Sequence, residues 1–275
     1  MTQPVPQSGA GISIAMAGTV SVVLGGTKGI GRAAVRKLAQ SGANVVIQGR
    51  DEAAARALVD ECSAHPGERV FVQSDLLSYA GIEQAVKTAH QRFSRVDVVI
   101  ASGGPSEPRP KLFVDMGPED GIAMLQSRLM PRLNALHAAV KYMKPQGYGK
   151  VILVTTDAGR IPTPAESMIG AAGAAIIFMT RALASELAGL GIRVNAVATT
   201  LTTGTPAHDR FLHARDSGSQ EVIVKAFTKA EARVKFRLNT AEDLAEYIHF
   251  LASPASDQIS GSTLSINGGL SFPSY

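Results

Sequence analysis

The sequence has little of what the specialised classes of protein need. Among its 275 residues there is one cysteine, Cys62, and no tryptophan. A single cysteine excludes a disulfide framework within the chain. A chain of this length buries roughly 70 to 75% of its surface on folding, so its core needs neither a disulfide nor a structural metal. We predict no metal site.

Long hydrophobic runs are also missing. The first 18 residues contain no basic region and no apolar run of the length that a secretion signal requires. No later apolar run reaches the roughly 18 residues that suggest a membrane span. We therefore expect a cytoplasmic protein without a membrane partner.

The charge is weakly biased, with a formal net charge of +4. The basic residues are scattered, and only residues 225–237 concentrate them. We interpret that segment as a solvated helical face, with phosphate or partner binding as the alternative. No nucleic-acid partner is expected.

Short β-branched runs alternate with longer helical patterns along most of the chain. The first strand is predicted over 19–24, a helix over about 30–41, and further strands over 44–48, 69–73, 96–101, 150–155, 193–198 and 263–266. The strands lack polar alternation, which is typical of a parallel sheet between two helical layers. We predict one doubly wound (Rossmann-type) α/β domain over 19–275, preceded by an arm over 1–18.

Two segments depart from this alternation, and both are expected beyond the carboxyl ends of the strands. One is the Pro-rich loop 102–118, and the other is an insertion over about 199–238, after the sixth strand. Long connections with apolar content are often functional, so the insertion is predicted to be a substrate lid. Its apolar residues would line a pocket for a flat apolar ligand or form the lid's own core, and they are Phe211, Val222, Ile223, Val224 and Phe227.

A glycine-rich turn follows the first predicted strand and opens the first helix. Such a turn lets the backbone approach a pyrophosphate, which then lies in the positive field of the helix end. The predicted dinucleotide-binding residues of this turn are Gly25, Thr27, Lys28, Gly29, Ile30 and Gly31.

The end of the second predicted strand favours NADPH over NADH. Proteins that bind NAD usually carry an acidic residue there for the ribose 2′-hydroxyl, whereas this chain reads Gln48-Gly49-Arg50. Arg50 can pair with a 2′-phosphate, and Lys28 is a second candidate cation. In the alternative interpretation Arg50 is a solvated loop residue whose charge Asp51 partly cancels.

From about residue 19 to residue 269 the sequence resembles the short-chain dehydrogenase/reductase family. Asp75 matches the family's adenine-binding Asp, the segment 241–269 is very similar to the family's last helix and strand, and Gly104 retains the last residue of the family's N-N-A-G sequence. The resemblance implies NADPH-dependent reduction. It adds Asp75, Leu76, Ser102, Gly103 and Thr199 to the predicted cofactor-binding residues.

The family's catalytic residues are mostly absent. Thr156 stands at the position of the catalytic Ser, Ile169 at that of the Tyr and Gly173 at that of the Lys, while Arg128 replaces the Asn. Residues 165–190 contain no Tyr or Lys, so a shift of register does not restore the pair. In the family, the Tyr transfers the proton and the Lys lowers its pKa.

Hydride transfer can nevertheless persist if the substrate supplies its own proton from a hydroxyl group beside the ketone. This predicts a polycyclic aromatic ketone, and the chain resembles in kind the atypical family members that lack the pair and reduce angucyclinones in antibiotic biosynthesis. A simpler quinone and a steroid-like ketone are the alternative substrates. Thr156 is the first candidate for a catalytic hydrogen bond and Ser102 a weaker one. Arg128 either fills the space left by Gly173, where it would touch the ribose or developing negative charge, or is a surface or interface residue.

Two alternatives stay open. His208 and His213 of the lid titrate near neutral pH and could act as acids, although each is more often solvated or structural. The chain could also be a catalytically silent NADP-binding sensor or scaffold.

The small residues over 170–175 let another backbone approach closely. In the family this helix often lies between subunits, so we expect a homodimer or homotetramer.

Overall fold

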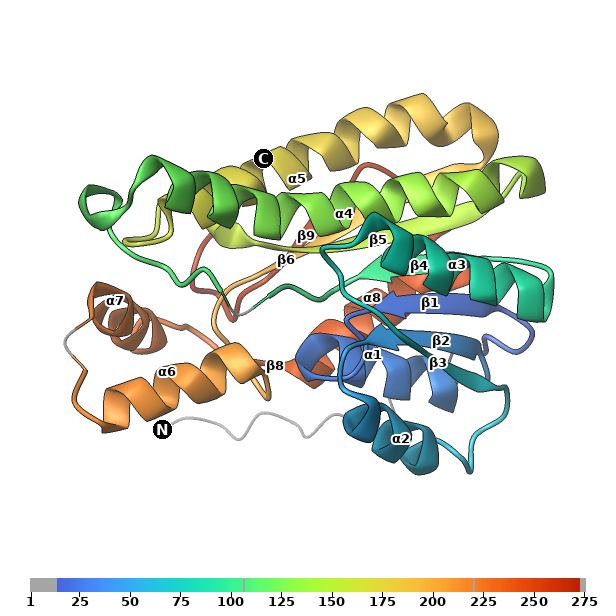
Figure 1. Ribbon diagram of the computed structural model, residues 1–275, viewed down its shortest axis with the longest axis horizontal. Coiled ribbons are helices and arrows are strands. Elements are labelled where there is room, and N and C mark those ends of the chain that lie inside the picture. The colour runs from blue at the N-terminus through green and yellow to red at the C-terminus, as the bar shows by residue number, and fades with distance from the viewer. Residues whose placement is uncertain (1–13, 106, 220, 273–275) are drawn as a thin grey trace.

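The computed structural model describes residues 14–105, 107–219 and 221–272. Seven parallel strands form one sheet in the order β3-β2-β1-β4-β5-β6-β9, which confirms the predicted doubly wound α/β architecture (Figure 1). The chain order reverses between β1 and β4, where a sheet of this kind opens its binding crevice. Most of the predicted N-terminal arm, residues 1–13, lies outside the described residues.

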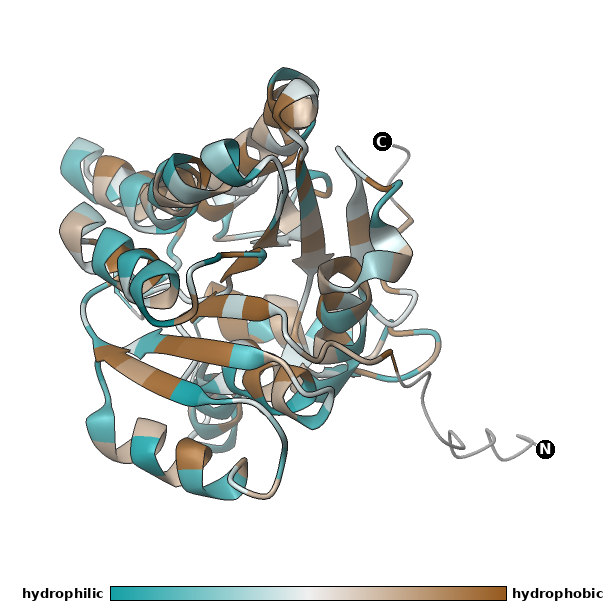
Figure 2. Cartoon of the chain, turned by 90° about the vertical axis from the view of Figure 1, so that its right-hand side faces the viewer, coloured by the Kyte–Doolittle hydropathy of each residue, from teal (hydrophilic) through white to brown (hydrophobic). Residues whose placement is uncertain are grey.

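All seven predicted strands are present, and their ends differ from the prediction by at most two residues. The strands of the sheet are β1 (Val20–Leu24), β2 (Asn44–Gly49), β3 (Arg69–Gln73), β4 (Val98–Ala101), β5 (Gly149–Thr156), β6 (Ile192–Thr199) and β9 (Thr263–Ile266). Every residue of β1 and β4 is buried, as are most residues of β5 and β6. Figure 2 shows these strands as predominantly hydrophobic, with hydrophilic residues on the outer faces of the helices.

The helices form two layers. One core packs α3 (Tyr79–Phe93), α4 (Pro118–Gln146) and α5 (Ser167–Leu187) on one face of the sheet. A second core packs α1 (Gly29–Gln40), α2 (Glu52–Glu61) and α8 (Ala241–Ala252) on the other face. Short 3-10 turns lie at Phe113–Asp115, Asp157–Gly159, Ala188–Leu190 and Pro254–Ser256.

The insertion after β6 folds as a separate small unit. It contains α6 (Pro206–Asp216) and α7 (Val222–Glu231), and the short strands β7 (Thr202–Thr203) and β8 (Asn239–Thr240) pair across its base. Its two helices lie to one side of the sheet, beyond the carboxyl ends of the strands (Figure 1). The basic residues of the 225–237 segment are exposed, as expected of a solvated face.

One helical segment exceeds the expected limit on apolar length. Residues 167–190, which include α5, are long and apolar enough to span a membrane by length and composition alone. In the fold, α5 connects β5 to its neighbour β6, and its residues Ile176 and Ala184 belong to the core. Crossover helices of parallel sheets are commonly this apolar because they cover a buried face.

Candidate active site

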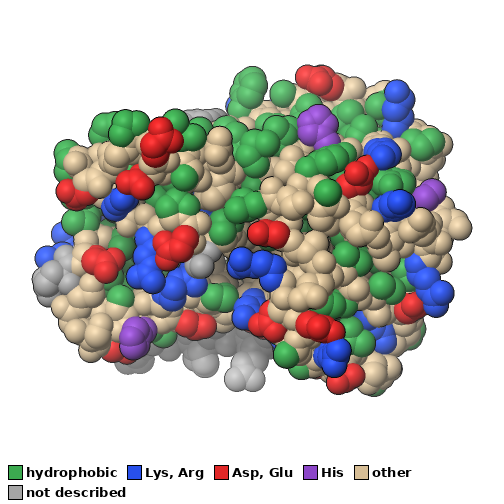
Figure 3. All heavy atoms as spheres, viewed as in Figure 1, with side chains coloured by type: hydrophobic (Ala, Val, Ile, Leu, Met, Phe, Trp, Pro, Cys, Tyr) green, Lys and Arg blue, Asp and Glu red, His purple; other side chains and the backbone are tan. Residues whose placement is uncertain are grey.

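A cavity of about 730 Å³ lies at the carboxyl ends of the strands, between the sheet and the lid. Its walls come from the β1–α1 turn, the ends of β2, β5 and β6, the loops after β3 and β4, and the lid helices. Every residue predicted above to bind the cofactor lines it, as do the catalytic candidates Thr156, Ser102 and Arg128. Figure 3 shows Lys and Arg side chains around a hollow between the lid and the body of the molecule.

The glycine turn is packed so closely that side chains are excluded from it. Gly25 has φ +74°, and a Cβ atom there would overlap the backbone of Gly103. A Cβ atom on Gly31 would overlap the carbonyl oxygen of Gly25. The side-chain oxygen of Gln48 accepts a hydrogen bond of 3.0 Å from the Gly25 amide and fixes the turn against β2. At the glycines of this turn the cavity is therefore lined by backbone atoms alone.

The first turn of α1 is suited to an anion. Its N-cap residue, Lys28, makes no side-chain capping hydrogen bond, and no acidic residue lies in the first turn. No side chain of the first turn therefore accepts a hydrogen bond from these amides or offsets the positive field of the helix end. This exposed backbone and the absent Cβ atoms fit a pyrophosphate.

The two predicted phosphate-binding cations differ in their partners. Lys28 Nζ lies 2.8 Å from Asp51 Oδ2, and this contact holds the pKa of Asp51 below its ordinary value. The guanidinium of Arg50 is exposed and makes no hydrogen bond or ion pair with the described residues. Asp51 therefore pairs with Lys28 and leaves Arg50 available. Thr27 packs over Gly49, directly before Arg50.

The remaining predicted cofactor residues are held by backbone contacts. Asp75 accepts a hydrogen bond of 3.0 Å from the Leu77 amide, and the Leu76 side chain packs against Gly103. The Ser102 hydroxyl donates to the carbonyl of Leu24 at 3.0 Å, so its hydrogen is already used within the protein. Ser102 thereby joins the ends of β1 and β4.

Thr156, at the end of β5, keeps a hydroxyl group at the cavity. Its Oγ1 accepts a hydrogen bond of 3.1 Å from the Ala158 amide. No described residue accepts its hydroxyl hydrogen, which remains available to a substrate. The hydrogen bond from the Ala158 amide holds the hydroxyl oxygen in one place.

The positions of the missing Tyr and Lys are occupied in different ways. Ile169 lines the cavity. At Gly173, a Cβ atom would lie 2.8 Å from Thr156 Cγ2 and 3.2 Å from Gly159 Cα. Because α5 has small residues here, the backbone that follows β5 packs directly against the helix. This is a close approach of the kind predicted for the helix. There is no space at Gly173 for the Arg128 guanidinium, and that expectation was wrong.

Arg128 is also not a surface residue. Its guanidinium is largely buried, lines the cavity and donates hydrogen bonds to the carbonyls of Pro105 and Pro108. Burial lowers its pKa below the ordinary value. The helical pattern of α4 did not indicate this burial. Arg128 thus ties the Pro-rich loop after β4 to the cavity wall.

Arg132 was missed by the sequence analysis. It lies one turn after Arg128 and is 7% exposed. It donates to the Val154 carbonyl through Nε and Nη2, at 3.1 and 2.9 Å, and to the Gly103 carbonyl through Nη1 at 2.6 Å. Burial lowers its pKa to about 10. The four-residue spacing from Arg128 was the available signal. Arg132 fixes the ends of β4 and β5 relative to each other.

Glu166 was missed as well. It lies one turn before Ile169, at the start of α5, and lines the cavity. Its carboxyl group makes no hydrogen bond or ion pair with the described residues, and it does not cap the helix. Desolvation raises its pKa to about 7, against a smaller opposing effect of Arg128. The sequence pattern carried no signal for this burial.

The lid contributes one of the two predicted histidines and most of the predicted apolar residues. His208 is 7% exposed and lines the cavity, whereas His213 is exposed and does not. Phe211, Ile223, Val224 and Phe227 line the cavity, but Val222 does not. Phe211 and Val224 are also buried in the lid's own core, so these two residues both line the cavity and stabilise the lid.

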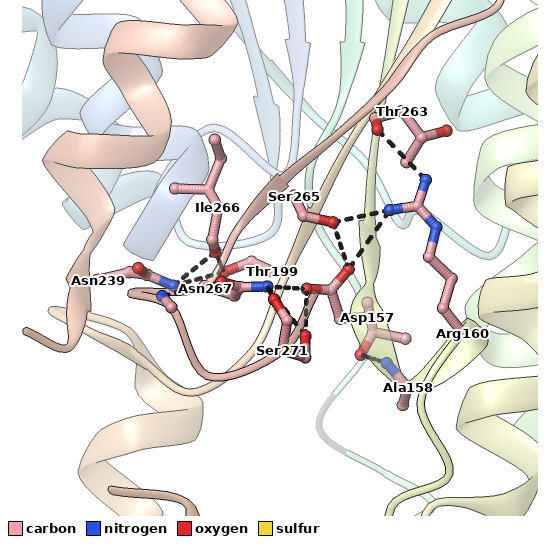
Figure 4. A network of polar contacts seen from close by, with 12 residues as sticks. Asp157, Ala158, Arg160, Thr199, Asn239, Thr263, Ser265, Ile266, Asn267 and Ser271 are labelled. Atoms are coloured by element: carbon pink, nitrogen blue, oxygen red, sulfur yellow. Dashed lines mark hydrogen bonds and ion pairs between the residues drawn. The ribbon is translucent and has the colours of Figure 1, made fainter. Parts of the chain in front are cut away.

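A polar network holds the strand ends under the cavity (Figure 4). The buried carboxylate of Asp157 accepts hydrogen bonds of 2.8 Å from Ser265 Oγ and from Asn267 Nδ2. Nearby, the Thr199 hydroxyl donates to the Ile266 carbonyl at 3.0 Å. The network joins the ends of β5 and β6 to β9 and to Asn267, which follows β9. It therefore positions Thr156 and Thr199 at the cavity.

Within the described part of the chain, no group of three or more His, Cys, Asp and Glu side chains is arranged to hold a metal ion.

Comparisons with known proteins agree with this geometry. Residues 25–271 match the family model described as enoyl-(acyl carrier protein) reductase. The chain is 33% identical to a 3-oxoacyl-[acyl-carrier-protein] reductase of Synechocystis, over 93% of this chain and 98% of that protein. It is 30% identical to the short-chain reductase NovJ of Streptomyces niveus, over 91% of this chain and 93% of that protein.

Two solved structures share the fold. A mutant of a Serratia marcescens short-chain dehydrogenase/reductase superposes with a TM-score of 0.80 at 24% identity, over 94% of this chain and 99% of that one. YwfH, described as an NADPH-dependent reductase involved in bacilysin biosynthesis, gives a TM-score of 0.80 at 22% identity, over 92% and 98% of the two chains.

Proposed function

The chain belongs to the short-chain dehydrogenase/reductase family and is an oxidoreductase, and on that premise we propose that it is an NADPH-dependent ketoreductase that works without the Tyr/Lys pair. The observation that carries the proposal is that one cavity brings together a glycine turn without side chains, the Thr156 hydroxyl, an apolar lid and Arg50, which has no partner among the described residues. The cofactor would supply a hydride.

The dinucleotide would be held by the residues that already suit it. The backbone of the Gly25–Gly31 turn would take the pyrophosphate and Arg50 the 2′-phosphate. Asp75, Leu76, Gly103 and Thr199 would enclose the adenine and nicotinamide ends. One structural neighbour is described as NADPH-dependent, which supports the same cofactor.

The substrate end favours a ketone on a flat, polycyclic aromatic molecule, such as an angucyclinone-like polyketide. Phe211, Ile223 and Phe227 give the cavity an apolar wall on the lid side. Thr156 would donate a hydrogen bond to the carbonyl oxygen, and a hydroxyl group beside the ketone would pass its proton to the developing alkoxide. A role in a biosynthetic pathway is in keeping with the structural neighbour that is described as a reductase involved in bacilysin biosynthesis.

A catalytically silent NADP-binding protein is the second candidate. It is favoured by the two positions that carry no acid–base group, Ile169 and Gly173. At Gly173, the methyl group of Thr156 and the backbone of Gly159 leave no room for a replacement side chain. We further propose a cytoplasmic homodimer or homotetramer without nucleic-acid or membrane partners.

NADPH oxidation by the purified protein, measured beside a direct NADPH-binding titration, separates the two candidates. The ketones should be matched pairs with and without an adjacent phenolic hydroxyl. The ketoreductase proposal predicts binding, with oxidation of NADPH by the hydroxyl-bearing members. Binding without oxidation by any ketone identifies the silent protein, and absence of binding contradicts both candidates.

A further inference from the structure

The cavity contains an acid that the proposed reaction has not yet used. We propose that the carboxyl group of Glu166 supplies the proton that ketone reduction consumes, in place of the missing Tyr. This inference rests on the proposed ketoreductase function. In this inference the protein supplies the proton, and the substrate hydroxyl only relays it to the alkoxide.

The position of Glu166 supports this role. It lies one helical turn before Ile169, the position of the missing Tyr, and shares the cavity with Thr156 and Arg128. Its carboxyl group has no hydrogen-bond or ion-pair partner among the described residues, so both oxygens are available to a ligand. Glu166 is half-buried, so its unpaired carboxyl group can be reached from the cavity.

The backbone beside Glu166 is strained. Ala165, the preceding residue, has φ +66° and is 6% exposed. A left-handed conformation at a residue other than glycine costs roughly 1 kcal/mol or more, and such strain concentrates at functional sites. This turn delivers Glu166 to the cavity at the start of α5.

The electrostatic surroundings keep Glu166 able to hold a proton near neutral pH. Desolvation raises its pKa to about 7, and Arg128 opposes the rise. The other charged or titratable groups that line the same cavity are Lys28, Arg50 and Asp75 at the proposed cofactor end, Arg109 of the Pro-rich loop, His208 and Arg210 of α6, and Glu221 before α7. An acid whose pKa lies near the working pH is the most effective proton donor.

The chemistry balances with one hydride and one proton. The hydride forms a new C–H bond at the carbonyl carbon, and the electron pair of the C=O π bond becomes an alkoxide lone pair. The neighbouring substrate hydroxyl gives its proton to this alkoxide, and Glu166 gives its proton to the hydroxyl oxygen. Glu166 is left as a carboxylate, which regains a proton from water.

The test compares the wild type with Glu166→Gln, which keeps the size of the side chain but cannot transfer the proton. Glu186→Gln, on the exposed face of the same helix, is the matched control. We expect kcat with hydroxyl-bearing ketones to fall about 10²-fold or more in Glu166→Gln. The decline of kcat/KM as the pH rises through about 7 should disappear in that variant and persist in the control.

A second measurement needs neither cofactor nor turnover. In protein labelled with ¹³C at the glutamate carboxyl groups, one resonance of the wild type should titrate near pH 7, and Glu166→Gln should lack it. An unchanged kcat and pH profile in Glu166→Gln, or the absence of such a resonance from the wild type, overturns the inference. If the wild type reduces no ketone, the proposed function fails and this inference fails with it.

Discussion

The selectivity of the proposed cofactor site depends on one residue, Arg50. Its guanidinium is exposed and unpartnered among the described residues, while the neighbouring Lys28 is paired with Asp51. A charge-assisted hydrogen bond to a phosphate contributes about 1.5 to 3 kcal/mol. Loss of Arg50 should therefore weaken the binding of NADPH and leave the binding of NADH unchanged.

We expect Arg50→Ala to weaken NADPH binding about 10- to 100-fold and to leave NADH binding unchanged. Isothermal titration with the two cofactors measures this directly. Arg56→Ala, an exposed residue of α2 paired with Glu52, is the control for general loss of positive charge. Equal losses for the two cofactors would show that Arg50 does not contact the 2′-phosphate.

Glu166 should also make the stability of the fold depend on pH. Its pKa is about 7 in the fold and 4.5 for an ordinary Glu, so the folded chain holds a proton that the unfolded chain releases. The contribution of Glu166 to stability is therefore fully present below about pH 4.5 and is lost as the pH rises through about 7. At about 1.4 kcal/mol for each pKa unit, this loss amounts to about 3 to 4 kcal/mol.

Urea unfolding of the wild type and Glu166→Gln at pH 5.5 and 8.5 tests this expectation. The variant should gain stability relative to the wild type at the higher pH. The same stability difference at the two pH values would show that the carboxyl group is solvated in the folded protein.

At the scale of elements, the lid depends on a small core of its own. Leu201, Phe211 and Val224 are its buried residues, and the rings of Phe211 and Phe227 lie 5.7 Å apart. Replacement of a buried Phe by Ala typically costs 3 to 5 kcal/mol. A unit this small has little stability to lose, so the damage should remain local.

In Phe211→Ala we expect faster amide hydrogen exchange over 206–231 and a raised KM for the ketone, with unchanged exchange in β1, β4 and β5 and unchanged NADPH binding. Phe236→Ala, at a residue that is 82% exposed, is the control. Uniform loss of protection across the sheet would mean that the lid and the sheet unfold as one unit.

The elements that sequence predicted well are those whose signal is local. The strands follow from β-branched runs, and the glycine turn follows from its place between a strand and a helix. The cavity's charged residues were harder, because their partners come from distant segments. Arg132 is explained by the carbonyls of Gly103 and Val154, at two strand ends that a helix pattern does not contain. The raised pKa of Glu166 likewise follows from desolvation in the folded chain, which the sequence pattern does not show.

At the scale of the whole molecule, α5 carries an exposed aromatic residue. Phe178 is 65% exposed, and the guanidinium of Arg181 lies 6.0 Å from the centre of its ring. An exposed apolar residue marks an interface where it belongs to a larger apolar patch. Since the small residues of α5 face the chain's own backbone at Gly159, Phe178 is the better candidate for the expected subunit contact.

Sedimentation velocity should show a dimer or tetramer for the wild type and a smaller species for Phe178→Glu. Tyr79→Ser, at an exposed position on α3, should sediment like the wild type. If the wild type is a monomer, or if Phe178→Glu assembles normally, α5 is not the contact.

The central claim is that this cavity transfers a hydride although the Tyr and Lys positions hold Ile169 and Gly173. Incubation of the protein with a hydroxyl-bearing polycyclic ketone and NADPH deuterated at C4, followed by mass spectrometry of the product, tests it most directly. We predict an alcohol with one deuterium on the carbinol carbon, from one of the two C4-deuterated diastereomers. Unchanged ketone, in a protein that binds the cofactor, would contradict the claim and identify a silent nucleotide-binding protein.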